Sequence, residues 1–258
     1  MNSIFLYVEK NGEITITGLK EGVSDTSIVI PETIDGMPVV EIGPKAFEFS
    51  TITDIKIGKN IKKIGEKAFY MCEKLQSVTW HCQCDVIPVG CFFGCSNLMQ
   101  FDFSGIKKIG GRAFYESGLQ EVCWTENTEV VSKKAFSCCK ILRTVIWNCK
   151  CNVIPVECFV RCSNLTKFDF SSVKRIEAYA FWRSGLTSVT LSKKTEVDQN
   201  CFAYCNDLEK IEWLSDRNIE KNIFAECKNI KEIFISDSVM DIAVDAFASS
   251  PNAEISFV

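Results

Sequence analysis

Histidine and long hydrophobic runs are scarce in this chain of 258 residues. The single histidine, His81, excludes metal sites built from several imidazole ligands and leaves one imidazole as a candidate general base. No apolar stretch approaches the roughly 20 residues that span a membrane as a helix, so we expect no membrane insertion. The first residues, MNSIFLYVEKNGEITITG, alternate like a strand and lack the charged segment and apolar run of a signal peptide.

An excess of positive charge is also missing, because 29 lysines and arginines stand against 33 aspartates and glutamates, for a net charge of −4. No long basic segment is present that could neutralise a phosphate backbone, so we expect no nucleic-acid partner. Neither a glycine-rich phosphate loop nor a G-x-S-x-G motif occurs in the sequence. The usual signals of a nucleotide-binding enzyme or a serine hydrolase are therefore absent.

What the chain has instead is an internal repeat, which decides the fold class before any local pattern does. Phenylalanine recurs ten times at intervals of 21 to 23 residues, and the position five residues earlier holds isoleucine or valine every time. A small or aliphatic residue, most often alanine, stands directly before each one. The repeat phenylalanines are Phe47, Phe69, Phe92, Phe114, Phe136, Phe159, Phe181, Phe202, Phe224 and Phe247.

A short strand pattern follows each repeat phenylalanine. Leu75-x-x-Val78-x-Trp80 is one example, and the segment 98–103, with Leu98, Phe101 and Phe103, is another. Residues two apart on a strand point to the same side, so the apolar residues face inward and the variable residues between them face outward. We therefore predict one strand in each unit.

A longer period lies on top of the repeat. Residues 80–98, WHCQCDVIPVGCFFGCSNL, reappear 67 places later as residues 147–165, WNCKCNVIPVECFVRCSNL. Every third unit is also one residue shorter after its phenylalanine, and it has serine where most of the others have cysteine. The array therefore looks built by duplication of a three-unit block.

The 15 cysteines raise the question of a metal site or a disulfide framework. Most of them fall in repeat columns that hold small or apolar residues, where free cysteine packs well. The C-x-C pairs at 82–84 and 149–151 lie three units apart, roughly 14 Å at strand spacing, so they cannot share one zinc ion. We predict mostly free, buried cysteines without a metal, with Cys82 and Cys149 the most exposed. Disulfides between cysteines stacked in neighbouring units are the alternative.

The unit I-x-x-I-x-x-x-A-F-x-x-C-x-x-L-x-x-V-x-W resembles the BspA-like leucine-rich repeat family, repeat proteins found on bacterial and protist surfaces. The resemblance runs from about Ile14 to Phe257, and residues 28–47 are similar to the family's opening cap and first repeat. It implies a leucine-rich repeat solenoid of the α/β-solenoid class. Such a fold is curved, with a single parallel sheet of short strands on its concave face and turns or 3₁₀ pieces on the other side. We accordingly expect a β-hairpin-like cap over residues 1–27 and ten to eleven units of 21 to 23 residues over 28–258.

The resemblance implies adhesion and protein binding, and it brings no catalytic, metal or cofactor residues. Geometry also disfavours a catalytic site. His81 and Cys82 would point to opposite faces of a strand, and Asp102 and Asp169 lie three units apart, beyond the roughly 5–10 Å of a catalytic carboxylate pair. We therefore expect a non-catalytic binding module that needs no cofactor, and not an enzyme.

The predicted outward rows of the strands are mixed and mildly polar. Ile146, Leu214 and Phe234 are apolar where these rows are otherwise polar, and Asp102 and Asp169 lie in the same surface. We therefore predict that these five residues contact the partner. A solvated face with no binding role is the alternative.

Large aromatic residues form a second stripe, one position after the repeat phenylalanines. Tyr115 and Trp182 are the candidates on this stripe, because large aromatic side chains often anchor interfaces. The alternative is that the stripe packs on itself between units, as in many solenoids.

The expected partner is a protein, such as a host or cell-surface protein, or a glycan. We expect a monomer. An edge-to-edge dimer through the C-terminal strand EISFV is one alternative, and a structural segment of a larger cell-surface repeat protein is another. The family resemblance suggests a cell-surface or secreted protein, whereas the missing signal peptide and the mostly free cysteines suggest the cytoplasm.

Overall fold

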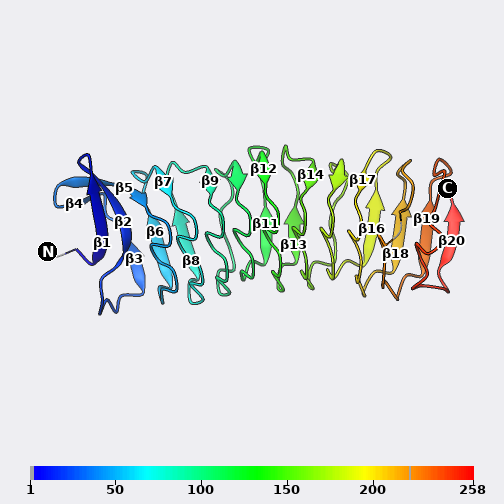
Figure 1. Ribbon diagram of the computed structural model, residues 1–258, viewed down its shortest axis with the longest axis horizontal. Coiled ribbons are helices and arrows are strands. Elements are labelled where there is room, and N and C mark those ends of the chain that lie inside the picture. Colours follow the sequence, from blue (N-terminus) through cyan, green and yellow to red (C-terminus); the bar gives the residue numbers. More distant parts are fainter. Residues whose placement is uncertain (1–2, 221) are drawn as a thin grey trace.

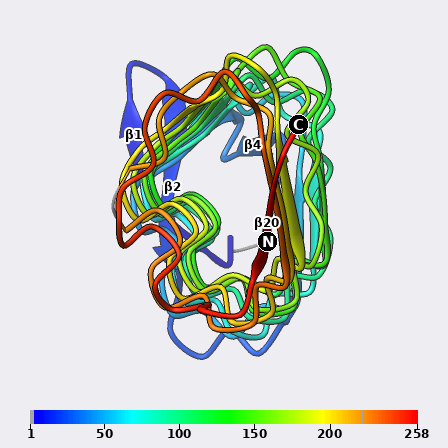
Figure 2. The ribbon, with the colours of Figure 1, turned by 90° about the vertical axis from the view of Figure 1, so that its right-hand side faces the viewer.

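The computed structural model describes residues 3–220 and 222–258, and its repeat units stack into one elongated row (Figure 1). Seen along the long axis, successive units superimpose as oval rings (Figure 2). Each ring therefore packs mainly on the ring before it and the ring after it, as in other solenoids. The predicted repeat solenoid is confirmed, and in the described part of the chain no helix occurs that could cross a membrane.

One side of each ring carries the strands that the L-x-x-V-x-W pattern predicted. They pair in parallel, with Ile55 opposite Val78 and Ile211 opposite Ile233. β-branched side chains such as these pack well on a pleated surface. We call the outward surface of this row the strand face. Its strands are β3 (Ser27–Val29), β6 (Asp54–Ile57), β8 (Ser77–Trp80), β11 (Glu121–Cys123), β13 (Thr144–Ile146), β16 (Ser188–Leu191), β18 (Lys210–Trp213), β19 (Glu232–Ile235) and β20 (Glu254–Phe257).

A second row of parallel strands, which the sequence analysis did not predict, follows the upper edge of the stack in Figure 1. It is centred on the isoleucine or valine that precedes each repeat phenylalanine by five residues, and Ile109 pairs with both Ile87 and Val131. Its strands are β5 (Met37–Ile42, with β4, Thr33–Ile34, antiparallel to it), β7 (Lys63–Ile64), β9 (Val86–Ile87), β10 (Lys108–Ile109), β12 (Val130–Val131), β14 (Val153–Ile154), β15 (Arg175–Ile176) and β17 (Glu196–Val197).

An antiparallel hairpin of β1 (Phe5–Lys10) and β2 (Glu13–Leu19) stands at the start of the chain. Asn11 and Gly12 adopt φ angles of 55° and 74°, the backbone that a two-residue hairpin turn requires. β2 also pairs in parallel with β5, so its Ile14 is fully buried against the first ring. A boundary between cap and solenoid at residue 27 stays a prediction.

The repeat phenylalanines form one column of stacked rings through the core. The ring centres of Phe114 and Phe136 lie 5.4 Å apart, and those of Phe136 and Phe159 lie 5.9 Å apart. Every neighbouring pair from Phe47 to Phe247 is stacked in this way, an arrangement that aromatic rings favour when they are offset. The column is therefore the continuous apolar contact between units.

The turn around each repeat phenylalanine alternates between right-handed and left-handed backbone. In nine units the residues two before and two after the phenylalanine have φ between 55° and 71°. Only Gly90 and Gly94 supply glycine at both places; other side chains there cost about 1–2 kcal/mol each. The alternation turns N–H groups toward the next unit, so that the N–H of Phe69 donates to the Cys91 carbonyl at 3.0 Å. These turns, and no 3₁₀ pieces, connect the strands of the described residues.

The cysteine column three residues after each phenylalanine is also a hydrogen-bond ladder. The Cys72 thiol donates to the Phe47 carbonyl at 2.9 Å, and the Cys162 thiol donates to the Phe136 carbonyl at 3.2 Å. Burial raises the pKa of Cys72 to about 12, which keeps its proton in place. The column holds only cysteine or serine, never alanine. The position therefore requires a small hydrogen-bond donor, whereas the sequence pattern indicated only a small side chain.

The first prediction concerns the phenylalanine column. Phe136 is fully buried between two stacked neighbours, whereas Phe247 is partly exposed and stacks on one. We expect Phe136→Ala to lower the free energy of unfolding by about 3–5 kcal/mol and Phe247→Ala to lower it by clearly less. Urea unfolding followed by circular dichroism measures both, and equal losses would contradict a column in which each ring depends on its neighbours.

The second prediction separates donor from size in the cysteine ladder. Cys162→Ser keeps a small donor to the Phe136 carbonyl, and Cys162→Ala removes it. We expect the serine variant to stay close to the wild type and the alanine variant to lose about 1 kcal/mol of unfolding free energy. If alanine proved as stable as serine in the same urea titration, size alone would explain the column.

Candidate functional site

The apolar candidates on the strand face do not form one patch. Ile146 and Leu214 are 50% and 40% exposed, and Phe234 is partly exposed with the Lys210 ammonium 5.0 Å from its ring centre. Ile146 lies four units from Phe234 along the row, roughly 19 Å at strand spacing. A partner would have to extend over five successive units of the strand face to contact both.

Asp102 and Asp169, the other candidates on this face, each hold a turn. The Asp102 carboxylate accepts the Ser104 N–H at 2.9 Å, and the Asp169 carboxylate accepts the Ser171 N–H at 2.9 Å. These hydrogen bonds lower the pKa of both aspartates. Both side chains are exposed, so they are charged groups on the surface with a local structural role.

The strand face is interrupted at the same two units. The prediction of strands at 98–103 and 165–170 is wrong, because neither segment pairs with a neighbour. The inward central residue is phenylalanine in these two units, Phe101 and Phe168, and isoleucine or valine in the others. The Phe101 ring lies 5.4 Å from the ring of Phe114. We infer that the width of this ring keeps the segment from pairing with β8. Hollows of about 400 and 650 Å³ lie beside these segments.

The flank of the solenoid carries the aromatic stripe and another hollow. Phe93 stacks on Tyr115 at 4.7 Å, but the next unit has Ser137 at this position and the stripe stops. It resumes at Trp182, which packs edge to face on Tyr204 at 5.6 Å. The gap is a hollow of about 420 Å³, which we call the aromatic groove; its lining includes Tyr115, Ser137, Glu157, Arg161, Tyr179 and Trp182.

Positive charge dominates the aromatic groove. The guanidinium groups of Arg161 and Arg183 lie 5.5 and 4.5 Å from the Trp182 ring, within the range of a cation–π contact. Lys134 and Glu157 form an ion pair at 3.0 Å and balance each other. In the described part of the chain Arg161 has no acidic partner, so its charge is available to a ligand.

Tyr115 is held at the other end of the groove by a thiol. The Cys138 thiol donates to the Tyr115 hydroxyl at 3.5 Å. Pairing with the Cys138 side chain and partial burial disfavour the Tyr115 phenolate and raise the pKa of Tyr115 to about 12. The phenol is therefore neutral at physiological pH and can donate a hydrogen bond. The structure thus brings Tyr115 and Trp182 into one hollow, while the strand-face candidates stay apart.

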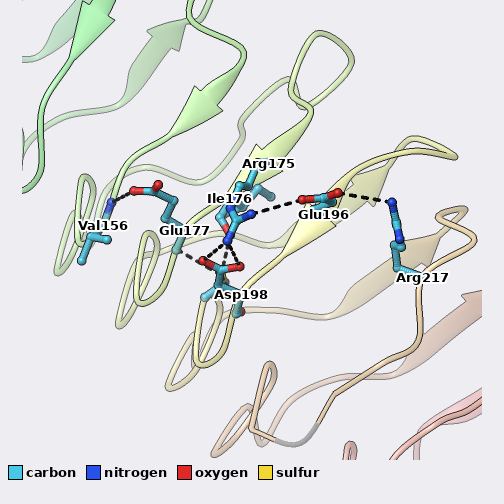
Figure 3. Close-up of polar contacts among 8 residues, drawn as sticks. Val156, Arg175, Ile176, Glu177, Glu196, Asp198 and Arg217 are labelled. Atoms are coloured by element: carbon cyan, nitrogen blue, oxygen red, sulfur yellow. Dashed lines mark hydrogen bonds and ion pairs between the residues drawn. The ribbon is translucent and has the colours of Figure 1, made fainter.

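A chain of ion pairs across the second row was missed by the sequence analysis (Figure 3). Arg175 contacts Asp198 at 2.9 Å and Glu196 at 3.3 Å, and Arg217 contacts Glu196 from the other side at 3.2 Å. Arg175 and Glu196 lie opposite each other where β15 pairs with β17. Opposite charges at the same repeat position of neighbouring units were therefore the sequence signal that could have predicted this ion pair. The charges satisfy one another and tie three units together.

The cysteines differ from the prediction in two places. The structure bonds Cys149 to Cys151, so the expectation of an exposed free thiol at Cys149 is wrong, and the exposed free thiol is Cys123. The alternative of bridges between stacked units also overlooked this pair, because its partners are two residues apart. Across residues 3–220 and 222–258, no three histidine, cysteine, aspartate or glutamate side chains gather in a way that could hold a metal ion.

Comparison with known proteins identifies the same repeat architecture. A family profile described as "BspA type Leucine rich repeat region (6 copies)" matches residues 20–143, 103–209 and 129–254. A leucine-rich repeat protein from Bacteroides ovatus has a similar structure, with a TM-score of 0.69 and 23% identity over 98% of this chain and 80% of that chain. No curated protein sequence matches.

Two further solved structures are similar. The leucine-rich repeat protein of T. pallidum has a TM-score of 0.62 and 23% identity over 80% of this chain and 88% of that chain. The pneumococcal vaccine antigen PcpA has a TM-score of 0.55 and 13% identity over 100% of this chain and 92% of that chain. At these identities the likeness is one of fold.

The third prediction tests the cause of the strand-face interruptions. Phe101→Val gives this unit the valine that neighbouring units have, so segment 99–103 should pair with β8 (Ser77–Trp80). We expect amide hydrogen exchange in β8 to slow by about tenfold, measured by NMR or mass spectrometry. Phe103→Val, which removes an inward ring at the next inward position, is the matched control. Equal exchange in the wild type and Phe101→Val would contradict a steric cause.

Proposed function

Because the chain belongs to the BspA-type leucine-rich repeat family, we propose that it is a non-catalytic protein-binding module that holds its partner in the aromatic groove. The family implies a protein-interaction or surface repeat module. The observation that carries the choice of the groove is the gap in the aromatic stripe at Ser137, which leaves a hollow of about 420 Å³ between Tyr115 and Trp182.

The groove has the features of a binding hot spot. Tyrosine, tryptophan and arginine are the residue types that most often dominate interfaces, and the groove places all three around one hollow. The guanidinium groups of Arg161 and Arg183 both contact the Trp182 ring, and these contacts restrain the ring before a partner arrives. A preorganised anchor loses little conformational entropy on binding. The dispersed apolar residues of the strand face offer no comparable site.

The charge of the groove indicates the chemistry of the partner. The whole chain carries a net charge of −4, yet the groove presents the guanidinium of Arg161 without an acidic partner in the described residues. A protein segment with an apolar side chain for the hollow and acidic side chains beside it would complement both features. Adhesion and a location at the cell surface stay predictions of the family resemblance, a glycan stays an alternative partner, and contact through Ile146 and Phe234 stays a prediction of the strand pattern.

The fourth prediction tests the groove with a peptide library displayed on phage. Peptides selected on the wild-type chain should combine acidic and apolar residues, and their affinity should fall with rising salt. Trp182→Ala and Arg161→Glu should each weaken a selected peptide by about tenfold or more, equivalent to about 1.4 kcal/mol, in a fluorescence anisotropy titration. Tyr70→Ala removes an aromatic residue of the same stripe outside the groove and should leave the affinity unchanged.

A second variant fills the groove instead of truncating it. Ser137 occupies the position that Tyr70 holds in the other copy of the three-unit block, so we expect the turn to accept Ser137→Tyr. The substitution removes the hydrogen bond that the buried Ser137 hydroxyl donates to the Glu157 carbonyl, and it leaves the Tyr115 and Trp182 residues unchanged. We expect this variant to remain folded and to lose the peptide. If binding survives Ser137→Tyr and Trp182→Ala but is lost in Ile146→Asp or Phe234→Asp, the binding surface is the strand face and the proposal is wrong.

A further inference from the structure

The two C-x-C loops are the same local structure in two covalent states. Cys149 and Cys151 are joined by a disulfide, with their Cα atoms 5.2 Å apart. Cys82 and Cys84 occupy the same positions 67 residues earlier, and both are free. Both loops bend at the same two residues, the first cysteine and the residue after it. One chain thus shows the closed and the open form of one loop.

The core holds both loops in the same way, independently of the disulfide. The Trp80 indole N–H donates to the Cys84 carbonyl at 3.0 Å, and the Trp147 indole N–H donates to the Cys151 carbonyl at 2.8 Å. Each indole belongs to the inward-facing row of its unit, so its hydrogen bond holds the backbone of the second cysteine from the core side. Because the open loop already has the bend and the anchor of the closed one, we expect it to close without a change in the surrounding fold.

The two thiols of the open loop are unequal in exposure and acidity. Cys82 is partly exposed, whereas Cys84 is only 9% exposed and its thiol donates toward the Ile61 carbonyl at 3.6 Å. Pairing with the Cys84 side chain lowers the pKa of Cys82, and the same pairing together with burial raises the pKa of Cys84. An accessible thiol with a lowered pKa beside a buried thiol with a raised pKa is the usual arrangement of an attacking and a resolving cysteine.

We propose that the two C-x-C loops are thiol–disulfide exchange sites, and that Cys82 and Cys84 form the same intraloop disulfide as Cys149 and Cys151 by reaction with low-molecular-weight disulfides. The Cys82 thiolate attacks one sulfur of the small disulfide, and the first small thiol leaves as a thiolate that takes up a proton. Cys84 then loses its proton to water and attacks the Cys82 sulfur, which expels the second small thiol. Two protein thiols lose two electrons and two protons, and one small disulfide becomes two thiols.

The reverse reaction opens Cys149–Cys151. A small thiolate attacks one sulfur of this bridge, and a second small thiol completes the reduction and leaves as part of a small disulfide. Partial exposure of both cysteines gives the attacking thiolate access. The buried cysteines of the phenylalanine turns, such as Cys72 and Cys139, lack this access and have raised pKa values, so they should not take part.

The test uses the full chain in glutathione buffers graded from reducing to oxidising. Free thiols are blocked with an alkylating reagent, disulfides are reduced and labelled with its heavy isotope form, and fragmentation mass spectrometry assigns each label. We expect Cys82 and Cys84 to become protected together, from about one-tenth to about nine-tenths over a hundredfold change in the ratio of oxidised glutathione to the square of reduced glutathione. Cys149 and Cys151 should become free together at the reducing end, while Cys72 and Cys139 report that the fold stays intact.

A variant isolates the intermediate. Cys84→Ser keeps a small donor at the buried position but cannot resolve a mixed disulfide, so Cys82 should accumulate one glutathione adduct in the oxidising buffer. The proposal is overturned if Cys82 and Cys84 of the wild type never become protected as a pair. It is also overturned if wild-type Cys82 keeps the glutathione adduct, or if excess reduced glutathione leaves Cys149–Cys151 closed in the folded chain.

Discussion

Every unit of this protein has to repeat the spacing of the unit before it, and that constraint governs nearly every side chain in the core. Backbone N–H groups of one turn donate to carbonyl groups of the next, so each residue lies directly above its counterpart. A side chain at a core position must then stack on a copy of itself, as the rings of Phe114 and Phe136 do, or donate across the gap, as Cys162 does. Thr128 does the same in another column, donating to the Ile106 carbonyl at 2.9 Å.

The same constraint explains where the surface acquires distinct features. A column that is filled uniformly gives a smooth surface, so hollows arise where one member differs in size from its neighbours. Phe101 is larger than the valine or isoleucine of its column, and the strand face opens beside it. Ser137 is smaller than the aromatic residues of its stripe, and the aromatic groove opens there. Candidate sites are therefore best sought at single departures from a repeat column.

The sequence was sufficient for the features that depend on the repeat. The spacing of Phe136 and its counterparts predicted the solenoid, the core column and the inward strand row. The second row escaped because strands of two residues, such as β10, are too short to show alternation. The hydrogen bond donated by Cys162 was not predicted, because the sequence indicates only that this column holds small residues. The aromatic groove could not be predicted, since it depends on which residues of four different units face the same space.

The duplicated three-unit block provides a comparison within one chain. Tyr70, Phe93 and Tyr115 of the first copy stack continuously, and the equivalent positions of the second copy are Ser137, Val160 and Trp182. The turns of the two copies share the same alternation of backbone handedness, so side-chain replacement is the difference that opens the groove of the second copy. The C-x-C loops show the converse, because their cysteines and anchoring tryptophans are identical whereas the covalent state differs. A fold that repeats its backbone so strictly leaves side-chain identity and thiol chemistry as the means by which one unit can differ in function from another.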